Sequence, residues 1–276
     1  MPMTKLNYLF SKNKIIQNWW MHRELIKEFS KREILIRYKG SMLGLMWSFF
    51  NPLFMLSIYT FVFSEIFKAR WNEINQTKTE FALLLFVGLL VFNLIAECLI
   101  RAPTIITTNI NYVKKVIFPL HILPLTVMIA ALFHGLISLF IWLIAYSIFI
   151  GMPQSTLIYL PLVITPYILF ILGLSWFLAS LGVFLRDVSQ FIGMMLNVLL
   201  FISPIFYPIT AIPEQYRFIF QLNPLTLVID QARLVMYWGS RPDFLLISVL
   251  FLFSIVIYYL GFVWFQITRK GFSDVL

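Results

Sequence analysis

The stretch "FALLLFVGLLVFNLIAECLI", Phe81 to Ile100, is apolar over twenty residues and contains one charged side chain, Glu97. An α-helix rises 1.5 Å per residue, so this length crosses a hydrocarbon core about 30 Å thick. Water is absent from that core, and a helix satisfies every backbone polar group within its own segment. The stretch therefore predicts a transmembrane helix.

Five further apolar blocks accompany it in a chain of 276 residues. Only 12% of the residues are charged, about half the share of a soluble domain, and 61% are hydrophobic. We therefore expect an all-α integral membrane protein with six transmembrane helices per subunit. The six blocks are Leu43–Phe63, Phe81–Ile100, Ile122–Ile150, Leu157–Leu185, Phe191–Ile209 and Phe244–Ile267.

The distribution of Lys and Arg predicts the orientation of these blocks. Fifteen of the 21 basic residues lie before the first block, between blocks two and three, between blocks four and five, or after the sixth. Basic residues near span ends concentrate on the cytoplasmic side. We expect both termini and the segment between blocks two and three to be cytoplasmic. The N-terminal residues lack the compact apolar core and cleavage site of a signal peptide.

Residues 1–40 form a predicted cytoplasmic N-terminus, and residues 41–276 form the transmembrane domain. Within the former, an amphipathic helix is expected to lie in the membrane interface. The alternative is a short cytosolic helix that packs on this protein or on a partner. The apolar residues that share one face of this helix are Met21, Leu25, Phe29 and Ile36.

Residues 204–242 between blocks five and six contain several prolines but are too apolar for a solvated loop. Irregular backbone is tolerated at membrane depth where protein or a water-filled cavity covers it. We expect two short helices, Pro213–Leu222 and Pro224–Trp238, that dip into the outer leaflet and act as a gate.

Two charges lie in or beside the second block, Glu97 and Arg101, four residues apart. Ionisable groups in membranes usually pair and face the bundle interior, so this spacing predicts an intramembrane ion pair. A proton relay is the alternative, but it calls for several carboxylates through the membrane. Proline in the first block (Pro52) produces either a packing kink or a widened lumen.

Aromatic residues make up 18% of the chain, and most of them face lipid or the core. Aromatic faces also bind sugars, because they combine an apolar plane with a polar edge. The aromatic residues that we expect along a translocation pathway are Phe50, Phe54, Tyr59, Phe201, Phe206 and Tyr207.

Motifs for catalysis are absent from the sequence: it has no phosphate loop, HExxH pair or GxSxG elbow. Cys98 is the single cysteine, and the three histidines are too far apart in sequence for a metal motif. We expect no enzyme activity, no metal and no cofactor in this chain, and no nucleic-acid partner. Any ATP and magnesium would be bound by another subunit.

Three long stretches together resemble the permease subunits of bacterial polysaccharide ABC exporters, which export O-antigen, capsule or teichoic acid chains. The resemblance covers nearly the whole chain in order. The stretches are "REILIRYKGSMLGLMWSFFNPLFMLSIYTFVFSEIF" (Arg32–Phe67), "FVGLLVFNLIAECLIRAPTIITTNINYVKKVIFPLHILP" (Phe86–Pro124) and "SPIFYPITAIPEQYRFIFQLNPLT" (Ser203–Thr226).

The resemblance implies a homodimer in the bacterial inner membrane with two copies of a nucleotide-binding ATPase subunit. The implied substrate is a lipid-linked glycan, usually carried on undecaprenyl pyrophosphate, and the O-antigen, teichoic acid and capsule alternatives stay open. It also implies that residues 102–119 form a cytoplasmic coupling segment that rests in a groove of the ATPase. The residues expected at this contact are Thr107, Thr108, Asn109, Ile110, Asn111, Tyr112, Val113, Lys114, Lys115 and Val116.

A cluster of basic residues on the expected interface helix offers a place where the lipid pyrophosphate would approach. Attraction of any anionic headgroup would leave the same pattern. Rival functions are an ATP-independent channel or secondary transporter, and an intramembrane glycan-processing enzyme, but the sequence lacks inverted repeats and converging carboxylates. The basic residues of the cluster are Arg23, Lys27, Lys31, Arg32, Arg37 and Lys39.

Overall fold

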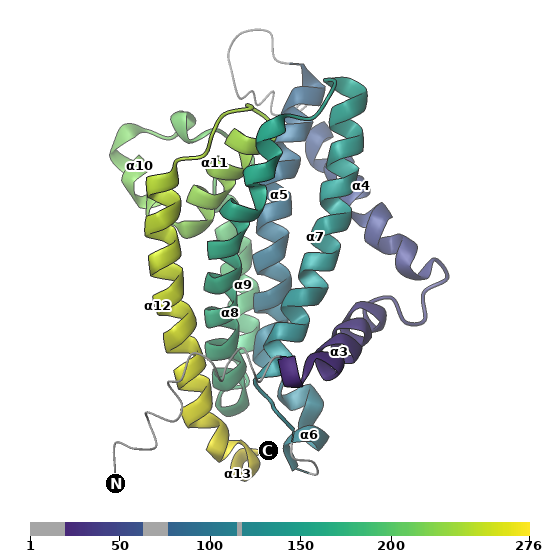
Figure 1. Ribbon diagram of the computed structural model, residues 1–276, viewed down its shortest axis with the longest axis vertical. Helices are drawn as coiled ribbons and strands as arrows, with labels where there is room; N and C mark the ends of the chain where they lie inside the picture. The colour runs from purple at the N-terminus through teal and green to yellow at the C-terminus, as the bar shows by residue number, and fades with distance from the viewer. Residues whose placement is uncertain (1–19, 63–76, 115–117) are drawn as a thin grey trace.

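The computed structural model describes residues 20–62, 77–114 and 118–276, and these residues form helices and connections without a strand (Figure 1). The all-α prediction is confirmed for this part of the chain. Short 3-10 helices join several of the α-helices. The α-helices are α3 (Arg23–Ile36), α4 (Trp47–Thr60), α5 (Lys78–Arg101), α6 (Ile110–Lys114), α7 (Ile122–Phe149), α8 (Leu160–Phe184), α9 (Val188–Ile202), α10 (Glu214–Gln221), α11 (Pro224–Met236), α12 (Phe244–Thr268) and α13 (Phe272–Val275).

Four helical stretches among the described residues are long and apolar enough to cross a bilayer. They correspond to the predicted blocks two, three, four and six, with blocks three and four ending one residue earlier than predicted. Each has at least 27 residues, more than the roughly 20 that a span needs. Their bounds, which include adjoining 3-10 turns, are Lys78–Thr104, Ile122–Phe149, Ser155–Phe184 and Phe244–Val275.

Predicted blocks one and five form the shorter helices α4 and α9, of 14 and 15 residues. At 1.5 Å per residue these helices reach about 20–23 Å, which is less than the hydrocarbon core. Block one ends at Phe63, outside the described residues, and α4 contains Pro52. The count of six spans therefore stays a prediction, as does the domain division at residue 40.

Helix α5 is the centre of the bundle. In its most apolar window 78% of the residues are buried inside the protein, against 28–39% in the other three long stretches. Helices α4, α7, α8, α9 and α11 all pack against it. A capping box fixes its start, because Thr77 accepts from the Glu80 amide and Glu80 accepts from the Thr77 amide.

Helices α8 and α12 pack together at unusually short range, on the side of the bundle away from α3 and α4 (Figure 1). A Cβ on Gly173 would lie 2.5 Å from the carbonyl oxygen of Ile257, and a Cβ on Gly261 would collide with the carbonyl of Gly173. Small residues allow helix backbones to approach in this way within membranes. The two glycines therefore set the α8–α12 distance.

The two short helices expected between blocks five and six are present as α10 and α11. Buried Arg233 on α11 donates hydrogen bonds to the carbonyls of Pro204 (2.6 Å), Ile205 (3.0 Å) and Leu84 on α5 (3.2 Å). These bonds satisfy backbone carbonyls that the irregular segment after α9 leaves outside a helix. Gly88 leaves room for the guanidinium, since a Cβ there would lie 2.8 Å from its Nη2.

The bundle has two distinct ends (Figure 1). Helices α10 and α11 lie at one end, whereas α6 and the C-terminal helix α13 lie together at the other. Helix α3 lies across the lower part of α7, nearer to the α6 end. The segment after α5 and the C-terminus thus share an end, which agrees with the predicted topology.

We expect Gly173→Ala to destabilise the protein, because the added methyl group forces α8 and α12 apart. Overpacking of this kind costs about 2 kcal/mol, which corresponds to a melting temperature lower by about 4–8 °C in a chain of this size. Thermal unfolding of the purified protein in detergent measures this melting temperature. Gly193→Ala on α9 is the control, because a Cβ there meets nothing within 4 Å. A control that melts as low as Gly173→Ala would contradict the assignment.

Candidate functional site

The backbone continues from the end of α5 through two 3-10 helices, η3 (Ala102–Thr104) and η4 (Thr107–Asn109), into α6. Ile105 and Ile106 are fully buried and anchor this connection in the core. Gly182 on α8 lies directly against Pro103, and a Cβ there would collide with the Pro103 carbonyl. The connection is therefore packed against the bundle, in contrast to a plain solvated loop.

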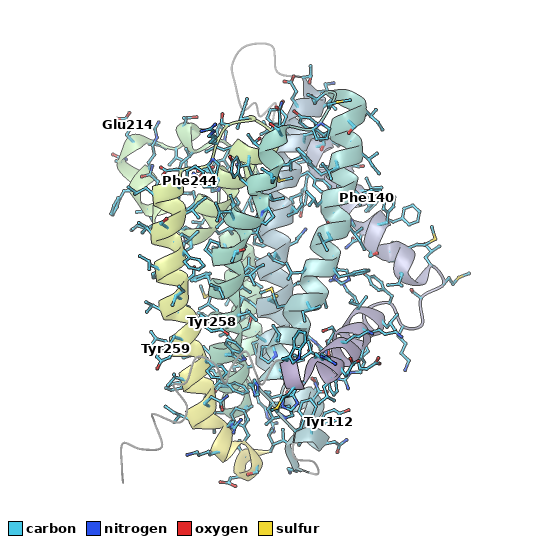
Figure 2. The ribbon with its side chains drawn as sticks, viewed as in Figure 1. Tyr112, Phe140, Glu214, Phe244, Tyr258 and Tyr259 are labelled. Carbon is cyan, nitrogen blue, oxygen red and sulfur yellow. The ribbon has the colours of Figure 1, made fainter. Side chains whose placement is uncertain are left out.

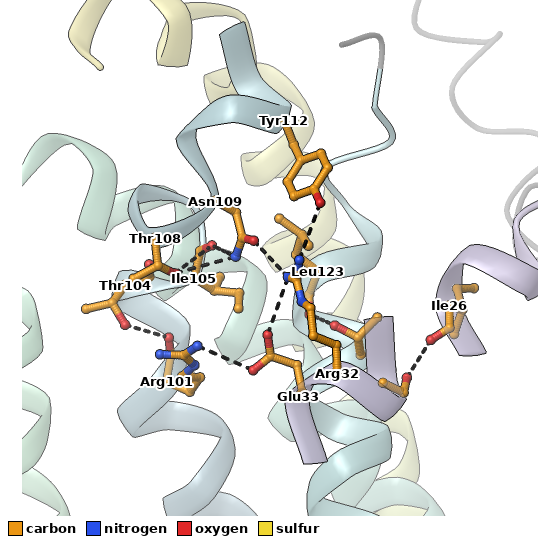
Figure 3. A network of polar contacts seen from close by, with 12 residues as sticks. Ile26, Arg32, Glu33, Arg101, Thr104, Ile105, Thr108, Asn109, Tyr112 and Leu123 are labelled. Carbon is orange, nitrogen blue, oxygen red and sulfur yellow. Dashed lines mark hydrogen bonds and ion pairs between the residues drawn. The ribbon is translucent and has the colours of Figure 1, made fainter. Parts of the chain in front are cut away.

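Arg32 on α3 binds this connection through its side chain (Figure 3). Its Nη2 donates to Asn109 Oδ1 at 2.8 Å, and its Nη1 donates to the Tyr112 hydroxyl at 3.4 Å. Asn109 is held in place by a bond from its Nδ2 to the Ile105 carbonyl at 2.9 Å. A planar guanidinium fork suits such a pair of acceptors.

A second polar contact and an aromatic cluster complete the junction. Glu33 on α3 accepts from Arg101 at the end of α5 (3.4 Å), and its side chain is 7% exposed. Phe29 packs its ring against Tyr112 at 5.2 Å, and the Arg32 guanidinium lies 4.3 Å above the Phe29 ring. We call this set of contacts between α3 and residues 101–114 the junction. It joins α3 to the connection by charge, hydrogen bonds and apolar contact at once.

Exposure divides the predicted coupling residues into two groups. Asn109 is buried and Tyr112 is half-buried, because both contact Arg32. Thr108, Asn111 and Lys114 are exposed. Their three-residue spacing places them on one side of the α6 region, so they form the face that is available to a partner. Lys115 and Val116 lie outside the described residues.

The start of α7 is fixed firmly after this connection. Trp176 on α8 donates to the His121 carbonyl at 2.9 Å, and Pro124 occupies the first turn of α7, where its missing N–H is tolerated. Burial, with Arg269 and His22 nearby, lowers the pKa of His121 to about 4. Its ring is therefore neutral at pH 7.

The predicted pair of Glu97 with Arg101 is not the pairing in the structure. Glu97 contacts Arg37 (2.7 Å) and His134 Nδ1 on α7 (2.7 Å), whereas Arg101 contacts Glu33. A partly buried carboxylate is better satisfied by two partners than by one neighbour on its own helix. Glu33 and His134 were missed because they lie far away in sequence, where helical spacing gives no signal.

Glu97 lines a cavity of about 370 Å³ between α4, α5 and α7. Tyr38 lies on its wall, with its hydroxyl 3.1 Å from His134 Nε2, and burial raises the pKa of this tyrosine. Asn51, Asn93 and Ser138 add further polar groups to an otherwise apolar wall. The cavity therefore offers hydrogen-bonding groups inside a bundle that is mostly apolar.

The predicted pathway aromatics fall into two sets. Tyr59 lines the cavity and contacts buried Phe206 at 5.4 Å, which in turn contacts Phe201 at 5.7 Å. Phe50 and Phe54 are exposed on α4. Tyr207 closes the cluster by donating from its hydroxyl to the Phe201 carbonyl, at 2.5 Å. The set brings α4 together with the segment after α9.

The predicted amphipathic helix is present as α3, but its contacts differ from the expected face. Ile26, Phe29 and Ser30 are buried, and α3 packs on α7. Packing of this helix on the protein itself was part of the alternative to a helix in the membrane interface. Leu25 and Ile36 from the expected face stay exposed. Of the six clustered basic residues, Arg32 and Arg37 are bound within the protein, as described above. The remaining four, Arg23, Lys27, Lys31 and Lys39, are exposed.

Comparison with known proteins identifies the family. The model of the ABC-2 type transporter family matches residues 24–237, which contain the junction, the cavity and both short helices α10 and α11. The chain belongs to the ABC-2 type transporter family. The resemblance stated from the sequence is thereby confirmed.

Relatives of this ABC-2 permease include three permease proteins of O-antigen export systems. RfbA of Myxococcus xanthus is 24% identical over 263 residues, which cover 95% of this chain and 98% of that protein. Two proteins named RfbA from Klebsiella pneumoniae are 24% and 25% identical, and each alignment covers 92% of this chain and 95% of the relative. The similarity is low in identity but extends over essentially the full length.

We expect Arg32→Met to loosen residues 109–114. Charge-assisted hydrogen bonds contribute about 1.5–3 kcal/mol, so amide hydrogen exchange in this segment should become at least about ten-fold faster. Lys39→Met is the control, since Lys39 is exposed just after α3. Unchanged exchange in Arg32→Met would show that the junction does not hold the segment.

We expect Glu97→Gln to destabilise the bundle, because Arg37 and His134 then lose their shared carboxylate. Removing one partner of a largely buried ion pair costs about 3 kcal/mol, visible as a lower melting temperature in detergent. Glu28→Gln on the exposed side of α3 is the control. Equal melting temperatures of the two variants would contradict a stabilising role for the cluster.

Proposed function

We propose that this chain is the transmembrane subunit of an ATP-driven exporter that moves a lipid-linked, O-antigen-like polysaccharide across the bacterial inner membrane. The substrate would travel from the cytoplasmic to the outer side. Two copies of the chain, each with six spans and cytoplasmic termini, would assemble with two ATPase subunits that bind ATP and magnesium. The family match and the names of the relatives support this proposal.

The observation that carries the proposal is the junction. Thr108, Asn111 and Lys114 present an exposed face at the end of the bundle, and the residues behind them are bonded to α3 through Arg32. A displacement of this face would also displace α3, because ion pairs, hydrogen bonds and close packing join α3 to residues 101–114. This is the arrangement that an ATPase-coupling segment needs.

Helix α5 offers a route from the coupling segment to the opposite end. Its C-terminal end continues into the coupling segment, and its Leu84 carbonyl accepts from Arg233 on α11. Movement of α5 would therefore displace α11 and, with it, α10. We propose that these two helices lie in the outer leaflet as a gate. The cavity beside α5 and the aromatic cluster of Tyr59, Phe201 and Phe206 would lie along the opening pathway.

The substrate would approach the membrane near α3. Arg32 and Arg37 are engaged with Asn109 and Glu97, so Lys39, which is exposed after the end of α3, is better placed to meet a lipid pyrophosphate. Ammonium groups are suitable point charges for phosphate. Capsule or teichoic acid chains on the same lipid carrier would present the same pyrophosphate.

Deletion of this chain identifies the substrate. We expect one surface polysaccharide to disappear while its lipid-linked precursor accumulates inside the cell. Loss of an O-antigen supports the proposal as stated, whereas loss of capsule or teichoic acid assigns the alternative polymer. An unchanged surface with no accumulated precursor would argue against glycan export altogether.

We expect the double variant Lys114→Glu, Lys115→Glu to uncouple the ATPase from export. Reversal of the charge at exposed Lys114, together with reversal at the next residue in the sequence, should repel the partner groove, so export should fall at least about ten-fold. Surface glycan and ATPase activity of the assembled complex are the measurements. Arg241→Glu is the control, an exposed residue in the connection between α11 and α12 at the opposite end. Normal export and ATPase activity in the double variant would refute the assignment of the coupling face.

A further inference from the structure

A groove of about 610 Å³ runs between α3 and α7 on the flank of the bundle, away from the cavity beside α5. Its floor is apolar and comes from three parts of the chain: Ile26 and Leu35 on α3, Leu45 before α4, and Ile129 and Phe133 on α7. The groove therefore lies where α3 meets the transmembrane bundle.

Apart from the basic side chains along its edge, the described residues that line this groove have one polar side-chain group. The one hydroxyl there belongs to Ser30, and it donates to the Ile26 carbonyl at 2.7 Å. A sugar or a polar peptide would lose hydrogen bonds to water here without replacement. The floor suits a hydrocarbon chain.

Three basic residues lie along the groove, Arg23, Lys27 and Lys31. They are spaced by four residues, so they form a row about 12 Å long on one side of α3. Arg23 has Glu24 at 3.7 Å, but Lys27 and Lys31 make no hydrogen bond or ion pair within the described part of the chain. No carboxylate is among the described residues that line the groove. The row attracts phosphate.

The apolar floor continues along α7 beyond the groove. Phe133, Leu136, Phe140 and Ile144 are all exposed and follow at helical spacing. Figure 2 shows Phe140 projecting from α7 away from the bundle. Because α7 is one of the membrane-spanning stretches, this stripe faces lipid. A hydrocarbon chain seated in the groove would thus extend directly into the bilayer.

We propose that the α3–α7 groove is a binding site for an anionic glycerophospholipid of the bilayer, with its acyl chain on the apolar floor and its phosphate at Lys27 and Lys31. The bound lipid bridges α3 and α7 and so supports the position of α3, which carries Arg32 and the junction. The proposal does not depend on which polymer is exported. It assigns these lysines a resident lipid even when substrate is absent.

The test is native mass spectrometry of the full-length protein, purified in detergent and supplied with phosphatidylglycerol or with phosphatidylcholine of the same acyl chains. We expect phosphatidylglycerol to be retained preferentially. The double variant Lys27→Gln, Lys31→Gln should lower its retention roughly five-fold per lysine, about 25-fold in total. The matched control Arg186→Gln, Lys270→Gln removes two exposed basic residues elsewhere and should retain the lipid like the unmodified protein.

Two further measurements fix the nature of the ligand. Ile129→Trp fills the groove floor and should lower the retention of both lipids without changing the charge. Glycerol phosphate, which has the headgroup chemistry but no chain, should not displace phosphatidylglycerol.

Four results would overturn the proposal. They are equal retention of the two lipids, retention in the lysine variant that matches the control, displacement of the lipid by glycerol phosphate, and displacement by undecaprenyl phosphate at lower concentration than by phosphatidylglycerol. The last result would assign the groove to the lipid carrier of the substrate. None of these measurements involves export, so their results can contradict the lipid site without contradicting the proposed function.

Discussion

Burial of α5 over most of its surface is the constraint on which the rest of the structure depends. A helix at the centre of a membrane bundle must be apolar almost throughout, and the few polar groups that it carries must find partners on the helices around it. Glu97 does so with Arg37 and His134, and the Leu84 carbonyl does so with Arg233. These contacts fix where α3, α7 and α11 can lie.

The same constraint explains why the functional contacts lie near the ends of α5. In its middle the helix is surrounded by apolar side chains, which pack well but give little directional specificity. At its ends, guanidinium groups form charge-assisted contacts between α5 and other helices, with a carboxylate or a carbonyl as the acceptor, and define orientation. Arg101 with Glu33 at one end and Arg233 at the other are the clearest examples. In the proposed exporter, these directional contacts at both ends of α5 would let a displacement at one end reach the other.

Much of the fold was predictable from the sequence because the bilayer imposes a simple length rule. Phe81–Ile100 and three other blocks meet this rule and form long helices, and the proline-rich segment was predictable as the two short helices α10 and α11. The helices of blocks one and five do not meet the same length rule, since α4 and α9 are too short to cross the hydrocarbon core alone. Pro52 within α4 illustrates why composition by itself does not define a span.

The candidate site was predictable only in outline. The position of the coupling segment followed from the resemblance, but the division between exposed Lys114 and inward-facing Asn109 depends on Arg32, 77 residues away from Asn109. Helical spacing suggested Arg101 as the partner of Glu97, and the tertiary structure supplied His134 instead. Charged partners on different helices leave no periodic trace in a single sequence, so such pairs need coordinates.

The glycine contact between α8 and α12 has a consequence for motion. At Gly173 and Gly261 the backbones of α8 and α12 touch, so no side chain lies between the two helices at this point that could shear or change its rotamer. Aromatic pairs such as Trp176 with Tyr258 fill the rest of the contact. The two helices therefore behave as one rigid plate during any rearrangement of the bundle. Sliding and rocking are left to the contacts of α3, α4 and α7, where side chains and a cavity separate the backbones. The permease thus consists of a stiff flank and a deformable flank, and residues 101–114 contact both, through Pro103 against Gly182 on α8 and through Asn109 and Tyr112 against Arg32 on α3.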